Sequence, residues 1–254
     1  MSDALTFIDT NLGRFREELN EFLRIPSISA KSEYDDETSR SAEWLASRMR
    51  EAGLEVEVLA TEGHPIVLGE WRGAGANAPT VLVYGHYDVQ PPEPLELWTS
   101  PPFEPTEREG RIYARGSADD KGQLYMHVKA LEAHLATSGS LPVNVVVLAE
   151  GEEEVGSPNL VPFVDAHLER LACDVVVISD TGMFAEGLPS ILFSLRGLAY
   201  FEIHVHGARS DLHSGEFGGS VMNPGNALSQ IIASLHDDQG RIALPGFYDD
   251  VVEW

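Results

Sequence analysis

Continuous apolar runs separated by helix-patterned segments most strongly restrict what this chain can fold into. The runs cover residues 80–84, 143–148 and 174–178. Because they are short and apolar on both faces, they predict buried central strands. Helices are expected near 122–137 and 158–170, the latter with Ser157 as its cap and Pro158 at its first helical position. This alternation of strand and helix predicts an α/β fold.

Two helices and a half-exposed strand are expected before the first of these runs. Apolar residues recur at helical spacing from Ile8 to Phe22, and Ile25-Pro26 ends that helix. The acids at 35–37 favour the start of a second helix, which Gly53 ends, and alternation over 54–58 predicts a strand.

The pattern changes after Arg196-Gly197. Polar and apolar residues alternate over 200–206, which predicts a half-exposed strand, and Asn223-Pro224 then opens an apolar helix. We therefore expect a domain boundary near residue 197, with a catalytic part over 1–196 and the start of a second domain over 197–254.

Charge and cysteine content exclude several classes of function. The chain has 41 acidic and 17 basic residues, a formal net charge of −24, so it should repel nucleic acid. Most of this excess is interpreted as a solubilising surface. Cys173 is the only cysteine and is expected to be a small core residue. No membrane-spanning run or secretory signal is visible, which predicts a cytoplasmic protein without a membrane partner.

Histidine and acidic residues follow the predicted strands, where α/β proteins commonly place ligand sites. In the segment Gly-His-Tyr-Asp-Val-Gln-Pro, the spacing of His86 and Asp88 lets the carboxylate accept the second imidazole N–H of a metal-bound histidine. In Arg-Gly-Ser-Ala-Asp-Asp-Lys-Gly, the adjacent anions Asp119 and Asp120 favour a cation. A phosphate loop is rejected there, because its Gly-Lys-Ser/Thr order is absent.

Two further acidic segments follow later strands. Glu150-Gly151-Glu152-Glu153-Glu154 crowds like charges after a strand that should be buried, so a carboxyl is protonated or a metal compensates the charge. Asp180 follows residues 174–178. Each segment alone is weak, because an acid after a strand is more often a cap or a solvated loop residue. Together they predict a histidine and carboxylate metal site suited to zinc, or to manganese or cobalt.

The remaining histidines give weaker signals. His204 and His206 share one predicted strand face, but no acidic motif is near them in sequence, so solvent exposure is favoured. His127 and His134 lie two turns apart on one predicted helix, which favours surface or boundary positions.

In this order, the motifs resemble those of peptidase family M20, the di-zinc peptidases that include carnosinases, bacterial dipeptidases, aminoacylase, succinyl-diaminopimelate desuccinylase and carboxypeptidase G. Asp-Asp-Lys-Gly, together with Asp-Leu-His-Ser-Gly at 211–215 and Gly-Gly-Ser-Val at 218–221, resembles the dipeptidase branch. The resemblance implies a mixed, mostly parallel central sheet flanked by helices, plus the start of a smaller α+β lid or dimerisation domain.

The resemblance also implies two metal positions. His86 and Asp180 would hold one ion and Glu154 the other, while Asp119 would bridge both. Glu153 would then be the general base and proton donor of a di-zinc hydrolase. Two Zn²⁺ ions are expected, with Mn²⁺ or Co²⁺ as alternatives.

Asp88 would orient His86, and the Asp119–Asp120 peptide would be cis. His213 in the second domain would reach the active site of a partner subunit and contact the substrate near the scissile carbonyl. A homodimer through that domain is therefore expected.

The resemblance further implies that a histidine beyond Trp254 completes the second metal position, which makes this chain an N-terminal fragment with a weak second site. The leading hypothesis is hydrolysis of dipeptides or short peptides. The alternatives are an amide deacylase acting on N-acyl amino acids and, from another class, a non-catalytic fragment or dimerisation module.

Overall fold

The computed structural model describes residues 2–188 and 190–252 of the chain. The chain divides after Leu192 into two compact units, and each unit is described by itself. The predicted boundary near residue 197 stays a prediction. Among the described residues, no helix is long and apolar enough to cross a membrane.

The first unit is built on a five-stranded mixed sheet with the order β1-β2-β6-β3-β7. Its strands are β1 (Glu55–Leu59), β2 (Ile66–Trp71), β3 (Thr80–His86), β6 (Asn144–Glu150) and β7 (Val175–Ile178). The pairs β1–β2 and β2–β6 are antiparallel, whereas β6–β3 and β3–β7 are parallel. The α/β class and the mixed sheet are confirmed.

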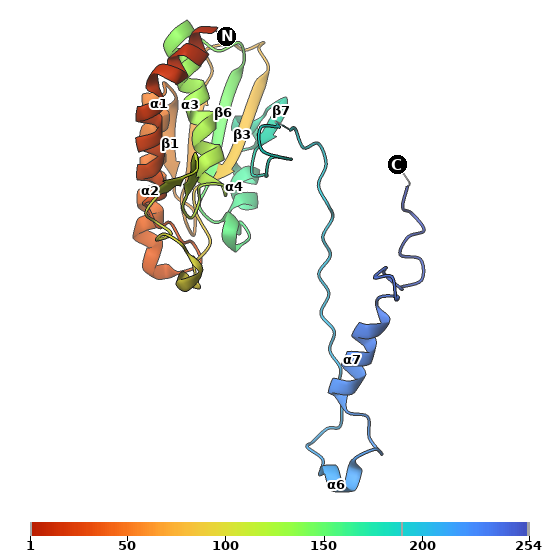
Figure 1. Ribbon diagram of the computed structural model, residues 1–254. Helices are drawn as coiled ribbons and strands as arrows, with labels where there is room; N and C mark the ends of the chain where they lie inside the picture. Colours follow the sequence, from red (N-terminus) through yellow and green to blue (C-terminus); the bar gives the residue numbers. More distant parts are fainter. Residues whose placement is uncertain (1, 189, 253–254) are drawn as a thin grey trace. The chain divides into compact units, whose positions relative to one another are not determined.

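Helices cover both faces of this sheet (Figure 1). One face carries α1 (Ser2–Leu23), α2 (Asp35–Glu51) and α3 (Lys121–Ser138), and the core there includes Val83 and Val147. The other face carries α4 (Leu160–Ala166) and α5 (Leu168–Leu171), over Leu82 and Val146. Neighbouring residues of β3 and of β6 thus enter opposite cores, which explains why these strands are apolar throughout.

A buried ionic network joins α1 to α3. Glu18 is almost fully buried and accepts hydrogen bonds from Lys129 at 2.6 Å, Tyr125 at 2.7 Å and Arg14 at 2.8 Å. Lys129 also pairs with Glu132 at 2.7 Å, while Arg48 of α2 lies 3.8 Å from Glu18. Burial alone would raise the pKa of Glu18, but these donors hold it below its ordinary value of 4.5.

Short elements connect the main ones. They are the 3₁₀ turns η1 (Ser32–Tyr34), η2 (Leu95–Leu97) and η3 (Glu153–Val155), and the hairpin of β4 (Thr106–Arg108) with β5 (Arg111–Tyr113). The sequence patterns did not predict β2, β4 or β5.

The prediction for 158–170 was wrong in detail. The helix starts later, at Leu160, and breaks at His167 into α4 and α5. Ser157 does not cap it, because its hydroxyl donates to Glu150 at 2.8 Å and its φ of 52° is left-handed. The Ser157 hydroxyl, which would have capped the helix, is therefore bound by the Glu150 carboxylate at the end of β6.

The prediction of a buried central strand over 174–178 was also wrong. β7 lies at the edge of the sheet, and three of its four residues are exposed. Cys173, just before it, is exposed rather than a core residue. An apolar composition alone does not distinguish an inner strand from an edge strand.

The second unit contains α6 (Ser214–Phe217) and α7 (Pro224–Ser234). Asn223 caps α7 as its sequence predicted, accepting from the N–H groups of Gly225 and Asn226. The strand predicted over 200–206 is not formed in the described residues, because a strand requires a paired neighbour and this segment pairs with none. His204 and His206 are exposed there, as expected.

Candidate metal centre

The carboxyl ends of three strands bring the predicted site residues to one edge of the sheet. β3 ends at His86, β6 ends at Glu150, and Asp180 follows β7 by two residues. Since β3 is parallel to both neighbours, these ends point the same way. The topology therefore gathers histidine and acidic side chains where α/β proteins commonly bind ligands.

His86 lies at the centre of the first ligand group. Its imidazole is fully buried, and Nε2 lies 3.1 Å from Asp119 Oδ1 and 3.7 Å from Asp180 Oδ2. Potential ligand atoms of these three residues all lie within 4.8 Å of one another. One imidazole nitrogen and two carboxylates form a donor set that suits zinc, manganese or cobalt.

Asp88 holds His86 from the opposite side of the ring. Its fully buried carboxylate lies 3.2 Å from His86 Nδ1, as the His-x-Asp spacing predicts. It also accepts a hydrogen bond from the Ser29 hydroxyl at 2.6 Å. Its oxygens accept further from the backbone N–H groups of Glu153 at 3.3 Å and Glu154 at 3.1 Å. One carboxylate thus fixes the imidazole and the backbone of the acidic segment.

That acidic segment forms a second ligand group around the same imidazole. His86, Glu153 and Glu154 offer ligand atoms within 4.8 Å of one another. Both glutamates lie in η3, where the chain turns directly after β6. Gln90 donates to Glu154 Oε2 at 2.8 Å and so fixes one of its oxygens. Glu153 has a partly buried carboxyl group, and within the described residues no side chain donates a hydrogen bond to it.

The Asp119–Asp120 peptide is cis, as the resemblance implies, and α3 starts directly after it. Asp120 is buried, and its Oδ2 accepts from the backbone N–H of His86 at 3.2 Å. Its Oδ1 is buried with no hydrogen-bond partner among the described residues. Lys121 is fully buried and donates to the carbonyls of Phe22 at 3.0 Å and Ile25 at 2.7 Å. Burial lowers its pKa to about 7.

Crowded carboxylates dominate the electrostatics of the site. Burial and neighbouring acids raise the pKa of Asp120 to about 7, and they raise the pKa values of Glu153, Glu154 and Asp180 above their ordinary range. Burial alone would lower the pKa of His86, but its hydrogen bond to Asp88 and the nearby carboxylates raise it to about 10.

These pKa shifts indicate a cluster with an excess of negative charge, which a proton on His86 partly neutralises when no metal is bound. A divalent cation would replace that proton, lie against the carboxylates and take His86 Nε2 as a ligand. The donor chemistry and the unpartnered Asp120 oxygen therefore fit a metal centre.

The structure brings together six of the predicted site residues: His86, Asp88, Asp119, Glu153, Glu154 and Asp180. Their individual roles, including the bridging role of Asp119, stay predictions. His213 lies in the second unit, where it caps α6 by accepting from the Gly215 N–H at 3.1 Å.

Sequence reasoning missed the hydrogen bonds of Gln90 and Ser29. Gln90 belongs to the segment that carries His86 and Asp88, so its position was a signal. Ser29 follows the first helix, and nothing in its local sequence indicates that it contacts Asp88.

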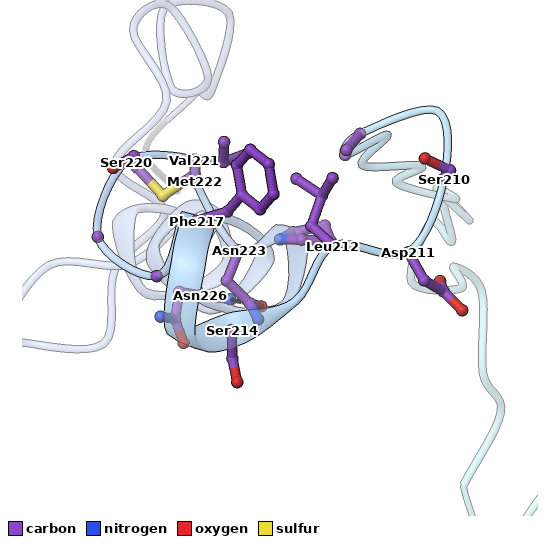
Figure 2. Close-up of a pocket in the computed structure, with 15 residues that line it drawn as sticks. Ser210, Asp211, Leu212, Ser214, Phe217, Ser220, Val221, Met222, Asn223 and Asn226 are labelled. Atoms are coloured by element: carbon purple, nitrogen blue, oxygen red, sulfur yellow. Dashed lines mark hydrogen bonds between the residues drawn. The ribbon is translucent and has the colours of Figure 1, made fainter.

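A hollow of about 800 Å³ lies in the second unit (Figure 2). Figure 2 shows Phe217 and Val221 near each other on one side of it and Ser214 and Asn226 on another. Its lining residues all fall within 207–226, and they offer mostly apolar, hydroxyl and amide groups, with the carboxylate of Asp211. The acid–base and metal-binding chemistry of the described chain is instead gathered around His86.

Comparison with known proteins gives a consistent family match. The model of "Peptidase family M20/M25/M40" matches residues 82–241. A Cys-Gly metallodipeptidase of Schizosaccharomyces pombe is 36% identical, over 97% of this chain and 54% of its own length. The human Beta-Ala-His dipeptidase is 33% identical, over 99% of this chain and 52% of its own length.

A solved structure agrees with these relatives. The M20 family metallo-carboxypeptidase of Sulfolobus solfataricus has a TM-score of 0.73 and 36% identity, over 94% of this chain and 54% of the solved chain. The present chain thus spans about half the length of the curated relatives that it matches.

Proposed function

The chain belongs to peptidase family M20/M25/M40, and from this premise we propose that the protein hydrolyses the peptide bond of dipeptides at the metal centre around His86. One observation carries the proposal. His86 Nε2 faces Asp119 and Asp180, while Asp88 binds the opposite ring nitrogen and the backbone that carries Glu153 and Glu154. Hydrogen bonds through Asp88 thus join His86 to the segment of Glu153 and Glu154, and Asp180 lies 3.7 Å from the same imidazole.

One donor group, His86, Asp119 and Asp180, would hold one ion. Glu154 belongs to the second donor group, with His86 and Glu153, and would hold the other ion together with Asp119, as the family resemblance implies. We propose Zn²⁺, with Mn²⁺ or Co²⁺ as alternatives suited to the same nitrogen and oxygen donors. When bound, such ions polarise a carbonyl oxygen and make water acidic enough to ionise near neutral pH.

Glu153 is the proposed general base. It lies within the ligand group yet is not held by Gln90 as Glu154 is. Burial and the nearby Glu154 raise its pKa toward the range in which a carboxyl both accepts and returns a proton. Its carboxylate would accept a proton from the attacking water and give it to the leaving amine nitrogen.

Dipeptides are the substrate class that the relatives favour. The names of the yeast and human relatives specify Cys-Gly and β-Ala-His. The similar Sulfolobus solfataricus protein is instead named a metallo-carboxypeptidase. The substrate contact of His213, a homodimer through the second unit and a cytoplasmic location stay predictions from the sequence.

The test is turnover of Cys-Gly and β-Ala-His by the purified protein with Zn²⁺, Mn²⁺ or Co²⁺, alongside N-acetylated amino acids. Amine release is expected from at least one dipeptide, and Glu153→Gln should lower its rate by at least about 100-fold. Hydrolysis of the N-acyl compounds alone would instead assign an amide deacylase. Tight metal binding without any turnover would favour the non-catalytic alternative.

A further inference from the structure

Helix α3 fixes one carboxylate of the His86, Asp119 and Asp180 group at its own N-terminus. The helix begins at Lys121, so Asp119 lies two residues before its first turn. The buried Lys121 side chain donates to the backbone carbonyls of Phe22, in the last turn of α1, and of Ile25, just beyond that helix. This end of α3, and with it Asp119, is therefore tied to the body of the first unit.

The second carboxylate, Asp180, lies in a tight turn beyond β7. The Thr181 N–H donates to the Ser179 carbonyl at 2.7 Å, which closes a three-residue turn with Asp180 at its centre. β7 is an edge strand whose pairing with β3 ends at Ile178. The backbone pairing of β7 therefore ends two residues before Asp180 and does not fix the position of this carboxylate.

A side chain of α3 reaches this turn. His127 lies two turns along the helix, half-buried, and its Nε2 is hydrogen-bonded to Ser179 Oγ at 2.5 Å. Burial lowers the pKa of His127, so its imidazole is neutral and has one donor and one acceptor nitrogen. A serine hydroxyl can complement either tautomer of such a ring.

We propose that His127 is a positioning residue for the metal centre, holding Asp180 in place through Ser179. Helix α3 then sets both carboxylates of this group relative to His86, Asp119 through its first turn and Asp180 through His127. The inference rests on the proposed function, because it concerns the metal affinity of the same site. Groups that orient metal ligands commonly contribute about 10–100-fold to affinity.

Titration with Co²⁺, followed by the visible absorption of the bound ion, tests this role. His127→Leu and Ser179→Ala should each weaken Co²⁺ binding by about tenfold and alter the spectrum, because Asp180 loses its fixed orientation. The double variant should bind no more weakly than the weaker single variant, because the two groups act as one unit. His127→Gln, whose amide can occupy the place of Nε2, should recover most of the affinity.

His134 offers a matched control on the same helix. It is exposed, and His134→Leu should leave Co²⁺ affinity and spectrum unchanged. Asp180→Ala should weaken binding strongly and so shows that the titration reports this site. Ser179→Ala removes one hydroxyl and keeps the test decisive if His127→Leu does not fold.

Two results would overturn the inference in distinguishable ways. Wild-type Co²⁺ affinity and spectrum in both His127→Leu and Ser179→Ala would refute the positioning role alone, even if both variants melted at a lower temperature. Failure of the wild-type protein to bind Co²⁺, or wild-type binding by Asp180→Ala, would refute the proposed metal site and this inference with it.

Discussion

Replacing Asp88 by asparagine should weaken metal binding without removing any ligand. The carboxylate lies between four donors, which are the Ser29 hydroxyl, His86 Nδ1 and the backbone N–H groups of Glu153 and Glu154. Asparagine keeps the shape but has one acceptor oxygen and one NH₂ group. Whichever way the amide turns, its NH₂ faces a backbone N–H.

The orientation with Oδ1 toward His86 costs least, because the Ser29 hydroxyl can then rotate and accept from the new NH₂ group. The N–H of Glu154 loses its acceptor, and an unsatisfied buried donor costs about 1–3 kcal/mol of folding free energy. His86 exchanges a charged partner for a neutral one, which reduces its basicity as a ligand. Loss of such a partner typically lowers metal affinity about 10–100-fold.

Isothermal titration of Zn²⁺ into wild-type and Asp88→Asn protein measures the affinity. Urea unfolding with a chelator present measures the folding term separately. Asp165→Asn is a matched control, because Asp165 is exposed on α4 and should change neither quantity. Zinc affinity equal to wild type in Asp88→Asn would refute the reasoning that this carboxylate orients the ligands.

Three further outcomes are expected. Glu153→Gln should lower dipeptide turnover by at least about 100-fold and leave Zn²⁺ affinity unchanged, since a general base contributes a factor of about 10²–10⁴ to the rate. Amine release measures the turnover and calorimetry measures the Zn²⁺ affinity. Retained turnover would exclude the role of general base for Glu153. Chelation should abolish turnover, and added Zn²⁺, Mn²⁺ or Co²⁺ should restore it; full activity in excess chelator would contradict a metal-dependent reaction. Glu18→Gln should destabilise the fold by about 2 kcal/mol at neutral pH, because the buried Lys129 then keeps Glu132 as its one carboxylate partner among the described residues. The folded-state pKa of Glu18 lies below 4.5, so this contribution is present above that pH and is lost as pH falls through the folded value. Urea unfolding at several pH values measures it, with Glu43→Gln, at an exposed position of α2, as control. A stability difference between Glu18→Gln and wild type that persisted in acid would contradict this prediction.

Secondary-structure elements could be predicted from sequence where one local signal was enough. Apolar runs predicted β3 and β6, and the proline after Asn223 predicted the start of α7. Prediction failed where a side chain could take either of two roles. Ser157 has the composition of a helix cap, but its hydroxyl binds Glu150, which only the three-dimensional structure brings to it.

The gathering of His86, Asp119 and Asp180 could also be predicted, because each follows or adjoins an element whose end is set by sequence pattern. The contacts that hold them could not. Ser29 reaches Asp88 across 59 positions of sequence, and His127 reaches Ser179 across 52. A histidine inside a helix has no local feature that separates a surface position from a contact of this kind.

The prediction for residues 174–178 was wrong about burial, yet the prediction that Asp180 joins the site did not depend on burial. That run was expected to be a buried inner strand, whereas β7 is an exposed edge strand. Asp180 nevertheless lies 3.7 Å from His86, because its position depends on parallel pairing with β3 and not on what covers the strand. Burial decides how apolar a strand must be, but strand direction decides which end presents its ligands. An edge strand has a ladder on one side only, so a ligand beyond its end depends more on side-chain contacts such as that of His127.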